Sequence, residues 1–184
     1  MKISEISFED DAFKEVIMEL GVEDCEQVTR IIARKRKITS APELHHFPNL
    51  VFLDLTKNLL AELDVSGNPL LEELYIGNNQ IEELDLSKNT QLTHLEIFMN
   101  DLTDLDLTAA PRLENLFANA NDLEALDLSQ NPEMEEVHLS DNNLKTITLA
   151  DGKTFFAFKA ENNPLADDVK ARLQSAVEPA NLKL

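Results

Sequence analysis

Four aspartates recur at a step of 21 residues and are the side chains of this sequence best suited to bind a cation. The series is Asp64, Asp85, Asp106 and Asp127, and Thr148 takes its next place. A serine or threonine follows each aspartate two residues later, and Ca²⁺ accepts such oxygen ligands. The glycine-rich nonapeptide of calcium-binding solenoids is missing. We therefore predict a solvated structural face, with a calcium-dependent surface or adhesion element as the alternative function.

The other residue types that support chemistry do not form a recognisable site. His45 and His46 are adjacent, and His94 and His138 lie about two of these steps apart, so no Cys or His spacing matches a zinc site. The single cysteine, Cys25, falls on the apolar side of an expected helix, where it packs as a small hydrophobic residue. Nucleophile elbows and phosphate-binding loops are also missing. The sequence therefore predicts no metal site, no cofactor, no catalytic residue and a protein that is not an enzyme.

Asparagines keep the same step and indicate that the chain is built of repeats. The series is Asn58, Asn79, Asn100, Asn121, Asn142 and Asn163, and the leucines Leu53, Leu74, Leu95 and Leu116 keep the step too. A period of about 20 to 29 residues with the spacing L-x-x-L-x-L-x-x-N is typical of a leucine-rich-repeat solenoid. An amide both donates and accepts hydrogen bonds, so stacked asparagines can satisfy backbone groups in neighbouring turns. We predict that the six asparagines form a structural ladder.

Each repeat divides again into ten and eleven residues, as the steps from Asn58 to Asn68 and then to Asn79 show. The second half repeats the first in outline, which predicts two short parallel strands per coil. The stretch from Leu71 to Asn89 follows the consensus of the bacterial leucine-rich repeats of 21 residues almost throughout. Residues 50–165 therefore resemble that family, and the resemblance implies its fold and a tendency to bind proteins or glycans.

Helices are expected at both ends, because the terminal coils of a solenoid would otherwise expose its core. An apolar face predicts a helix over residues 7–20, with Ser7 and Asp10 as a possible capping box and Gly21 as its stop. Another helix is expected from Ala166 to Val177. The predicted fold is α/β, a leucine-rich-repeat solenoid with a helical N-terminal cap and a C-terminal capping helix. In this single structural domain, residues 1–49 form the cap and junction, 50–165 the solenoid, and 166–184 the capping helix and tail.

A further helix of the N-terminal cap is predicted from Asp24 to about Arg36. Asp24 and Gln27 form a possible capping box at its start. The basic run Arg34–Lys37 would then lie at its end, where positive charge suits the helix dipole. A localisation or docking signal is the alternative reading of this run.

The charge of the chain restricts the classes of partner. Its formal net charge is −19, and an acidic surface of that size repels nucleic acids and anionic membranes. No window has the length of a membrane span, and the acidic N-terminus lacks the features of a secretory signal. If Met1 is the native start, we expect a cytoplasmic monomer. Secretion by a signal-independent route, or the loss of a leader, stays open.

The outward positions of the first strand differ most between repeats, and they predict the binding surface. One of these positions reads Asp54, Tyr75, Glu96, Phe117, His138 and Lys159, whereas the second strand is uniform. An apolar patch ringed by charge usually marks an interface. The predicted partner-binding residues are Tyr75, His94, Glu96, Phe98, Met99, Phe117, Asn119 and His138. The sequence thus predicts a protein–protein interaction module whose concave face binds a macromolecule, a protein or, as the second choice, a glycan.

Overall fold

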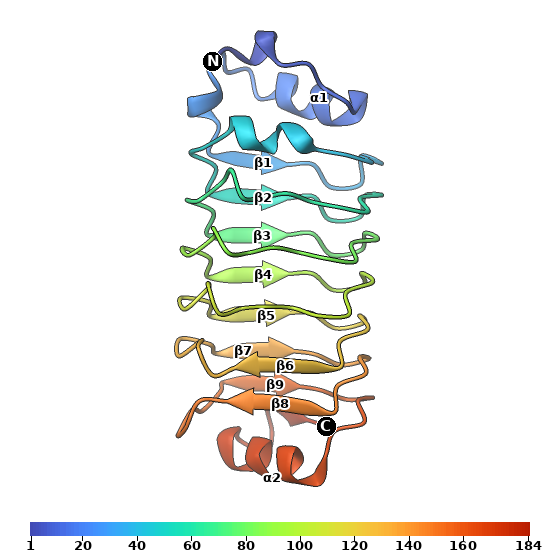
Figure 1. Cartoon of the computed structure of the whole chain (residues 1–184), viewed down its shortest axis with the longest axis vertical. Helices are drawn as coiled ribbons and strands as arrows, with labels where there is room; N and C mark the ends of the chain where they lie inside the picture. The colour runs from blue at the N-terminus through green and yellow to red at the C-terminus, as the bar shows by residue number, and fades with distance from the viewer.

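The computed structural model describes residues 1–184 and shows a stack of coils with helix α1 (Asp11–Glu19) at one end and helix α2 (Asp167–Ala176) at the other (Figure 1). Each coil contributes one short strand to a parallel eight-stranded sheet, in the order β1-β2-β3-β4-β5-β7-β9-β10. These strands span, in the same order, Arg30–Ile32, Phe52–Asp54, Glu73–Tyr75, His94–Glu96, Asn115–Phe117, Glu136–His138, Ala157–Lys159 and Leu182–Lys183. The predicted solenoid of parallel strands is confirmed.

The repeated leucines place one buried side chain at the centre of each strand. Leu53, Leu74, Leu95 and Leu116 pair in register and have no exposed surface. Successive side chains of a strand point to opposite faces, so the first and third residues of each strand point away from this core. Those outward residues form the candidate binding face.

A second strand in every coil is predicted, and the structure forms one in only two coils. Strand β6 (Ala125–Leu128) pairs in parallel with strand β8 (Thr146–Leu149). The second halves of the earlier coils still bury Leu63 and Leu105, but they make no ladder of strand hydrogen bonds. Burying a leucine fixes its position without requiring a paired backbone. β8 is rich in β-branched residues, which favour the pleated conformation of a strand.

The N-terminal helix α1 spans Asp11–Glu19, a shorter range than predicted. Its N-cap is Asp10, whose carboxylate accepts a hydrogen bond from the Phe13 amide at 2.9 Å. The predicted capping box between Ser7 and Asp10 is therefore wrong. Gly21, with φ at 67°, lies just past the helix in the left-handed conformation that a glycine adopts without steric cost.

The helix predicted from Asp24 to Arg36 is wrong. The reciprocal bonds of Asp24 and Gln27 form as expected, but they enclose only a single 3₁₀ turn, Cys25–Gln27. The chain then enters β1, which pairs with β2 in parallel. Hydrogen bonding to a strand about 20 residues further on outweighs the local helical pattern, and the basic run lies in the turn after β1. Two further 3₁₀ segments, Ile3–Glu5 and Pro42–His46, complete this end of the molecule.

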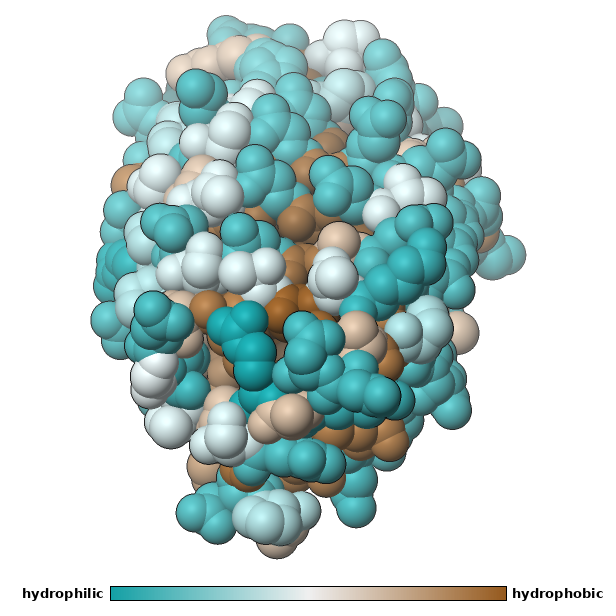
Figure 2. Space-filling view, turned by 60° about the horizontal axis from the view of Figure 1, so that its bottom comes forward, coloured by the Kyte–Doolittle hydropathy of each residue, from teal (hydrophilic) through white to brown (hydrophobic).

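The predicted C-terminal helix is confirmed as α2, which spans Asp167–Ala176 and is one residue shorter at each end than predicted. Val169, Leu173 and Ala176 are buried against the last coils. Strand β10 follows α2 and pairs with β9. Seen with this end forward, hydrophilic residues cover most of the surface, and hydrophobic residues show as small areas between them (Figure 2). No helix has the length and apolar character needed to cross a membrane.

Candidate binding face

The turn after each first strand has the same unusual backbone. The residues that precede the asparagine ladder all have φ between 53° and 61°: Lys57, Asn78, Met99, Ala120, Asp141 and Asn162. A left-handed conformation costs a residue other than glycine about 1–2 kcal/mol. Met99 and Ala120 adopt it as well as Asn78, so the geometry is imposed by the coil and not by the residue type.

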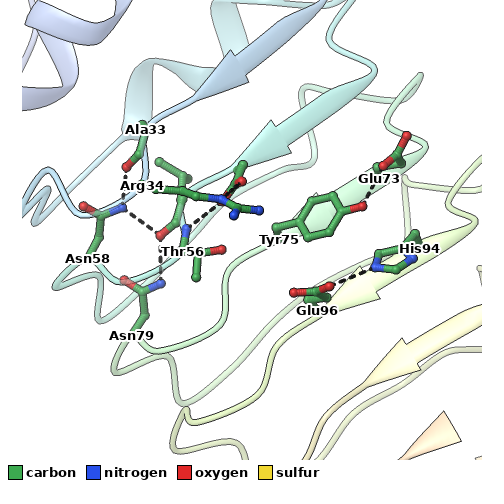
Figure 3. A network of polar contacts seen from close by, with 11 residues as sticks. Ala33, Arg34, Thr56, Asn58, Glu73, Tyr75, Asn79, His94 and Glu96 are labelled. Atoms are coloured by element: carbon green, nitrogen blue, oxygen red, sulfur yellow. Dashed lines mark hydrogen bonds and ion pairs between the residues drawn. The ribbon is translucent and has the colours of Figure 1, made fainter.

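The six asparagines hold these turns in place by hydrogen bonds to the preceding coil. Asn100 is typical: its Oδ1 accepts from the Ile81 amide at 3.1 Å, and its Nδ2 donates to the carbonyls of Ile76 and Ile97 at 3.1 and 3.0 Å. Asn58 and Asn79 make equivalent contacts (Figure 3). Because every coil repeats these contacts, the turns that follow the strands have the same position in each coil. The outward residues of neighbouring coils are therefore aligned.

Five rings form a column across the outward side of the eight-stranded sheet, one from each strand β2, β3, β4, β5 and β7. The aromatic column consists of Phe52, Tyr75, His94, Phe117 and His138. Successive ring centroids lie 5.1, 4.8, 5.4 and 4.6 Å apart. The Tyr75 and His94 rings are stacked at an interplanar angle of 29°, the pairs Phe52–Tyr75 and His94–Phe117 are tilted, and Phe117 meets His138 edge-on. Contacts between the rings are therefore continuous across five neighbouring strands.

A carboxylate accompanies three of these rings on the same strand. The Tyr75 hydroxyl donates to Glu73 Oε2 at 2.7 Å, and His94 Nε2 lies 3.3 Å from Glu96 Oε1 (Figure 3). His138 Nε2 lies 2.9 Å from a Glu136 oxygen without the alignment of a hydrogen bond. Each ring thus meets the carboxylate two residues away in sequence.

The surroundings shift the pKa of two of these rings. Burial, together with the Glu73 carboxylate, raises the pKa of the Tyr75 hydroxyl well above its usual range. Burial, and next the charge of Lys159, lowers the pKa of His138. Tyr75 therefore stays a hydrogen-bond donor, and the neutral imidazole of His138 is favoured.

The first coil supplies its own cations to the N-terminal end of this face. The guanidinium carbon of Arg30 lies 3.3 Å from the centroid of the Phe52 ring. Arg34 Nε donates to the Asp54 carboxylate, which is almost completely buried. The end of the aromatic column is therefore covered by one arginine, and the neighbouring carboxylate is neutralised by another.

The structure brings together some of the predicted site residues and separates others. Tyr75, His94, Phe117 and His138 belong to the aromatic column, and Glu96 lies beside it. Phe98, Met99 and Asn119 follow the strands and are not part of the column. The Phe98 ring lies on Gly77 of the preceding coil, where an added Cβ would come within 2.5 Å of the ring. Met99 is exposed in the left-handed turn.

The sequence reasoning missed Arg30, Phe52, Glu73 and Glu136. Phe52, Glu73 and Glu136 occupy the first position of their strands, and a strand turns residues i and i+2 to the same face. That alternation was the available signal. Arg30 was hidden by the wrong assignment of its segment to a helix. These four residues extend the candidate face beyond the predicted set.

The aspartate series lies outside this face, on the second halves of the coils. All four carboxylates are exposed, and each accepts a hydrogen bond from the amide two residues later, at 2.8 to 2.9 Å. The hydroxyl of Ser66 lowers the pKa of Asp64 most, and the amide of Ser87 lowers that of Asp85. No group of three or more His, Cys, Asp or Glu side chains is arranged to hold a metal ion. These contacts explain the series as a local backbone feature.

Comparison with known proteins relates the chain to others by its fold. No protein-family model and no curated protein sequence matches it. An internalin from Listeria monocytogenes superposes with a TM-score of 0.81 at 20% identity, covering 96% of this chain and 56% of the other. The leucine-rich-repeat domain of APL1 gives 0.71 at 22% identity, with 83% and 42% covered. A leucine-rich-repeat protein from Leptospira interrogans gives 0.57 at 21% identity, with 77% and 45% covered.

The extent of these matches limits what they establish. This chain spans about half the length of the matched structures. At identities of 20 to 22%, these matches establish the architecture alone and give no information about the residues of the outward face. The chain thus has the fold of the leucine-rich-repeat proteins, as a solenoid of parallel strands with a step of about 21 residues.

Proposed function

We propose that this chain is a non-enzymatic protein–protein interaction module of bacterial origin. Its partner binds the outward side of strands β3, β4, β5 and β7. The matched structures support this class, because their fold is generally used for protein–protein interaction. The binding residues are the predicted set of Tyr75, His94, Glu96, Phe98, Met99, Phe117, Asn119 and His138, joined by Glu73 and Glu136. The observation that carries the proposal is the continuity of the aromatic column across neighbouring coils.

Folding does not require aromatic side chains at these outward positions. The third position of the strand holds Asp54 in β2 and Lys159 in β9, and both coils form. Tyr75 and Phe117 are only half-buried, and contiguous apolar surface ringed by charge usually marks an interface. Aromatic residues also contribute strongly to the energies of such interfaces. A column that spans several coils therefore fits a partner larger than a small molecule.

The packing of the rings favours a protein over a glycan. A sugar ring stacks on an open aromatic face, and the faces of Tyr75 and His94 cover each other at a centroid distance of 4.8 Å. The carboxylates beside the rings instead suit side chains that make charged or polar hydrogen bonds. The ligand class that matches this surface is a polypeptide.

A blocking substitution tests the position of the interface. Asn115 lies at the first position of β5, is half-buried, and is in register with His94 of β4 and Glu136 of β7. Asn115→Arg places a long charged side chain on the face without removing a ring. The partner, captured from a lysate of the source organism, should then bind at least about tenfold more weakly, roughly 1.4 kcal/mol.

The matched control is Thr103→Arg, an exposed position in a turn outside the sheet. This variant adds the same side chain and should bind the partner as the unchanged chain does. Equal binding by both variants, measured with equal melting temperatures, would show that the partner does not use this face.

A further inference from the structure

The central part of the outward face carries glutamates and has no lysine or arginine on its strands. Strands β3, β4, β5 and β7 contain Glu73, Glu96 and Glu136, and none of the four contains lysine or arginine. The residues that immediately precede β3, β5 and β7 are the exposed Glu72, Glu114 and Glu135. Between Lys57 and Lys159, the four basic residues lie outside the strands of this sheet: Lys88, Arg112, Lys145 and Lys153.

The three strand carboxylates are positioned by neighbouring rings, and none of them forms an ion pair with a lysine or arginine. Glu73 accepts the Tyr75 hydroxyl, and Glu96 and Glu136 lie beside the imidazoles of His94 and His138. These ring groups restrain the carboxylates at fixed places along the aromatic column. A hydroxyl leaves the charge of its carboxylate in place, and burial keeps the His138 imidazole from charging readily. The face therefore holds oriented negative charges beside apolar rings.

At the N-terminal end of the same face, arginines of the chain itself contact an aromatic ring and a carboxylate on one strand. β2 has an aromatic residue, a leucine and an acidic residue in its three positions, and β4 has His94, Leu95 and Glu96 in the same order. In β2 the aromatic ring is covered by Arg30, and Asp54 is paired with Arg34, both from the preceding coil. In β4 the preceding coil places Glu73 beside His94 and Tyr75 beside Glu96, and neither is a cation. The cations that complete β2 are missing from β4.

We propose that the outward face of β3, β4, β5 and β7 binds a basic, arginine-containing segment of the protein partner, whose guanidinium groups pair with Glu73, Glu96 and Glu136. This inference rests on the proposed function and adds the chemistry of the partner. An arginine fits better than a lysine, because its planar group pairs with a carboxylate bidentately and packs against aromatic side chains. Charge complementarity to an acidic surface also accelerates association.

The composition of the chain provides a local reporter of binding. Tyr75 is the single tyrosine and the chain has no tryptophan, so the intrinsic fluorescence comes from β3, the first strand of the proposed site. The probe is a short oligo-arginine peptide, and its neutral analogue is an oligo-citrulline peptide of the same length. Oligo-arginine should change the Tyr75 emission with a saturable curve, and oligo-citrulline should leave it unchanged.

Two triple variants with equal charge change separate this face from the general acidity of the chain. The face variant is Glu73→Gln, Glu96→Gln and Glu136→Gln. The control variant is Glu62→Gln, Glu83→Gln and Asp104→Asn, three exposed positions in the second halves of successive coils. Affinity for oligo-arginine should fall at least about tenfold in the face variant. It should change less than about twofold in the control, with both proteins folded by circular dichroism.

The opposite outcomes are equally definite. Equal weakening in both triple variants, or an oligo-arginine peptide that leaves Tyr75 emission unchanged, would overturn the inference. If Asn115→Arg still abolishes binding of the natural partner in that case, the face binds a segment that is not basic, and the proposed function stands. If oligo-arginine behaves as expected but Asn115→Arg keeps the natural partner, the proposed function fails separately.

Discussion

Each asparagine after a first strand makes hydrogen bonds to several backbone groups with a single side chain. A single amide satisfies one N–H of the preceding coil and two carbonyls, as Asn100 does with Ile81, Ile76 and Ile97. Its buried position removes water as an alternative partner. Aspartate has no donor, and leucine has neither donor nor acceptor. The identity of the residue at this position therefore follows from the backbone groups that surround it.

Replacement of Asn100 by leucine tests this account. Asn100→Leu leaves the Ile81 amide without a partner, and it removes one of the two asparagine donors from each of the Ile76 and Ile97 carbonyls. A buried unsatisfied group costs about 1–3 kcal/mol. The midpoint of chemical denaturation should fall accordingly. The exposed neighbour Asp101 is the control, since Asp101→Leu should change stability by no more than about 0.5 kcal/mol. An unchanged midpoint for Asn100→Leu would contradict the role of the ladder.

Tyr75 allows a second test at the same scale, because tyrosinate absorbs in the near ultraviolet and this chain has one tyrosine. Burial is the main cause of its raised pKa and the Glu73 carboxylate the next. The folded protein should titrate well above about pH 10, and the denatured protein at about 10. Glu73→Gln should lower the folded value but leave it above 10. A Tyr75 that titrates at the unfolded value would show that its hydroxyl is not held by Glu73.

The same shift has a consequence for stability, with a definite sign. The folded-state pKa of Tyr75 lies above the unfolded-state value, so the unfolded chain loses its proton first as the pH rises. The contribution is therefore fully present below about pH 10 and is lost above it. Tyr75→Phe should remove this alkaline dependence, as measured by denaturation at a series of pH values.

At the scale of elements, the prediction from sequence and the structure differ most in the N-terminal segment. The repeated strands could be predicted, because every coil has the same leucine and asparagine pattern and each repeat confirms the last. Residues 24–36 have no such repetition, and Cys25, Val28 and Ile31 fit a helical face as well as a buried strand. Pairing of Ile31 with Leu53 decides between them, and that contact lies outside any local pattern.

The candidate face shows the same limit. Its third-position residues were visible as a diverse series, and the contacts among Tyr75, His94 and Phe117 follow from their adjacent coils. Ring stacking between first and third positions depends on side-chain rotamers, which the sequence does not specify. The match between Gly77 and Phe98 is likewise a packing relation that becomes visible only when the two coils are placed side by side.

The proposed cap of residues 1–49 can be tested by truncation. Deletion of residues 1–37 removes α1 and β1, and it exposes the edge of β2 together with buried residues of the next coil. The shortened chain should aggregate or expand, as measured by light scattering and size-exclusion chromatography. A monomer with an unchanged melting temperature would mean that this segment is an independent appendage.

At the scale of the whole molecule, the large negative charge affects the stability of the fold. It carries 35 acidic and 16 basic Lys and Arg residues, and repulsion between like charges opposes the folded state. Added salt screens this repulsion, so the melting temperature should rise as ionic strength increases from about 0.01 to 0.15 M. Sodium and potassium chloride should act alike. A melting temperature that falls with salt would show that attractive ion pairs outweigh the repulsion.

The asparagine contacts also make each coil a unit that can be deleted or duplicated as a whole. Asn142 donates to Ala118 of the preceding coil as Asn100 donates to Ile76, so each bond reaches only the adjacent coil. Deletion of residues 101–121 should bring Asn142 onto Ile97 and give a folded chain with β4 beside β7, detectable by its far-ultraviolet spectrum and a cooperative melt. Loss of cooperative melting would contradict this picture. A gene that duplicates or loses such a unit changes the reach of the binding face by one strand spacing, about 4.8 Å, and leaves the plan of the core unaltered.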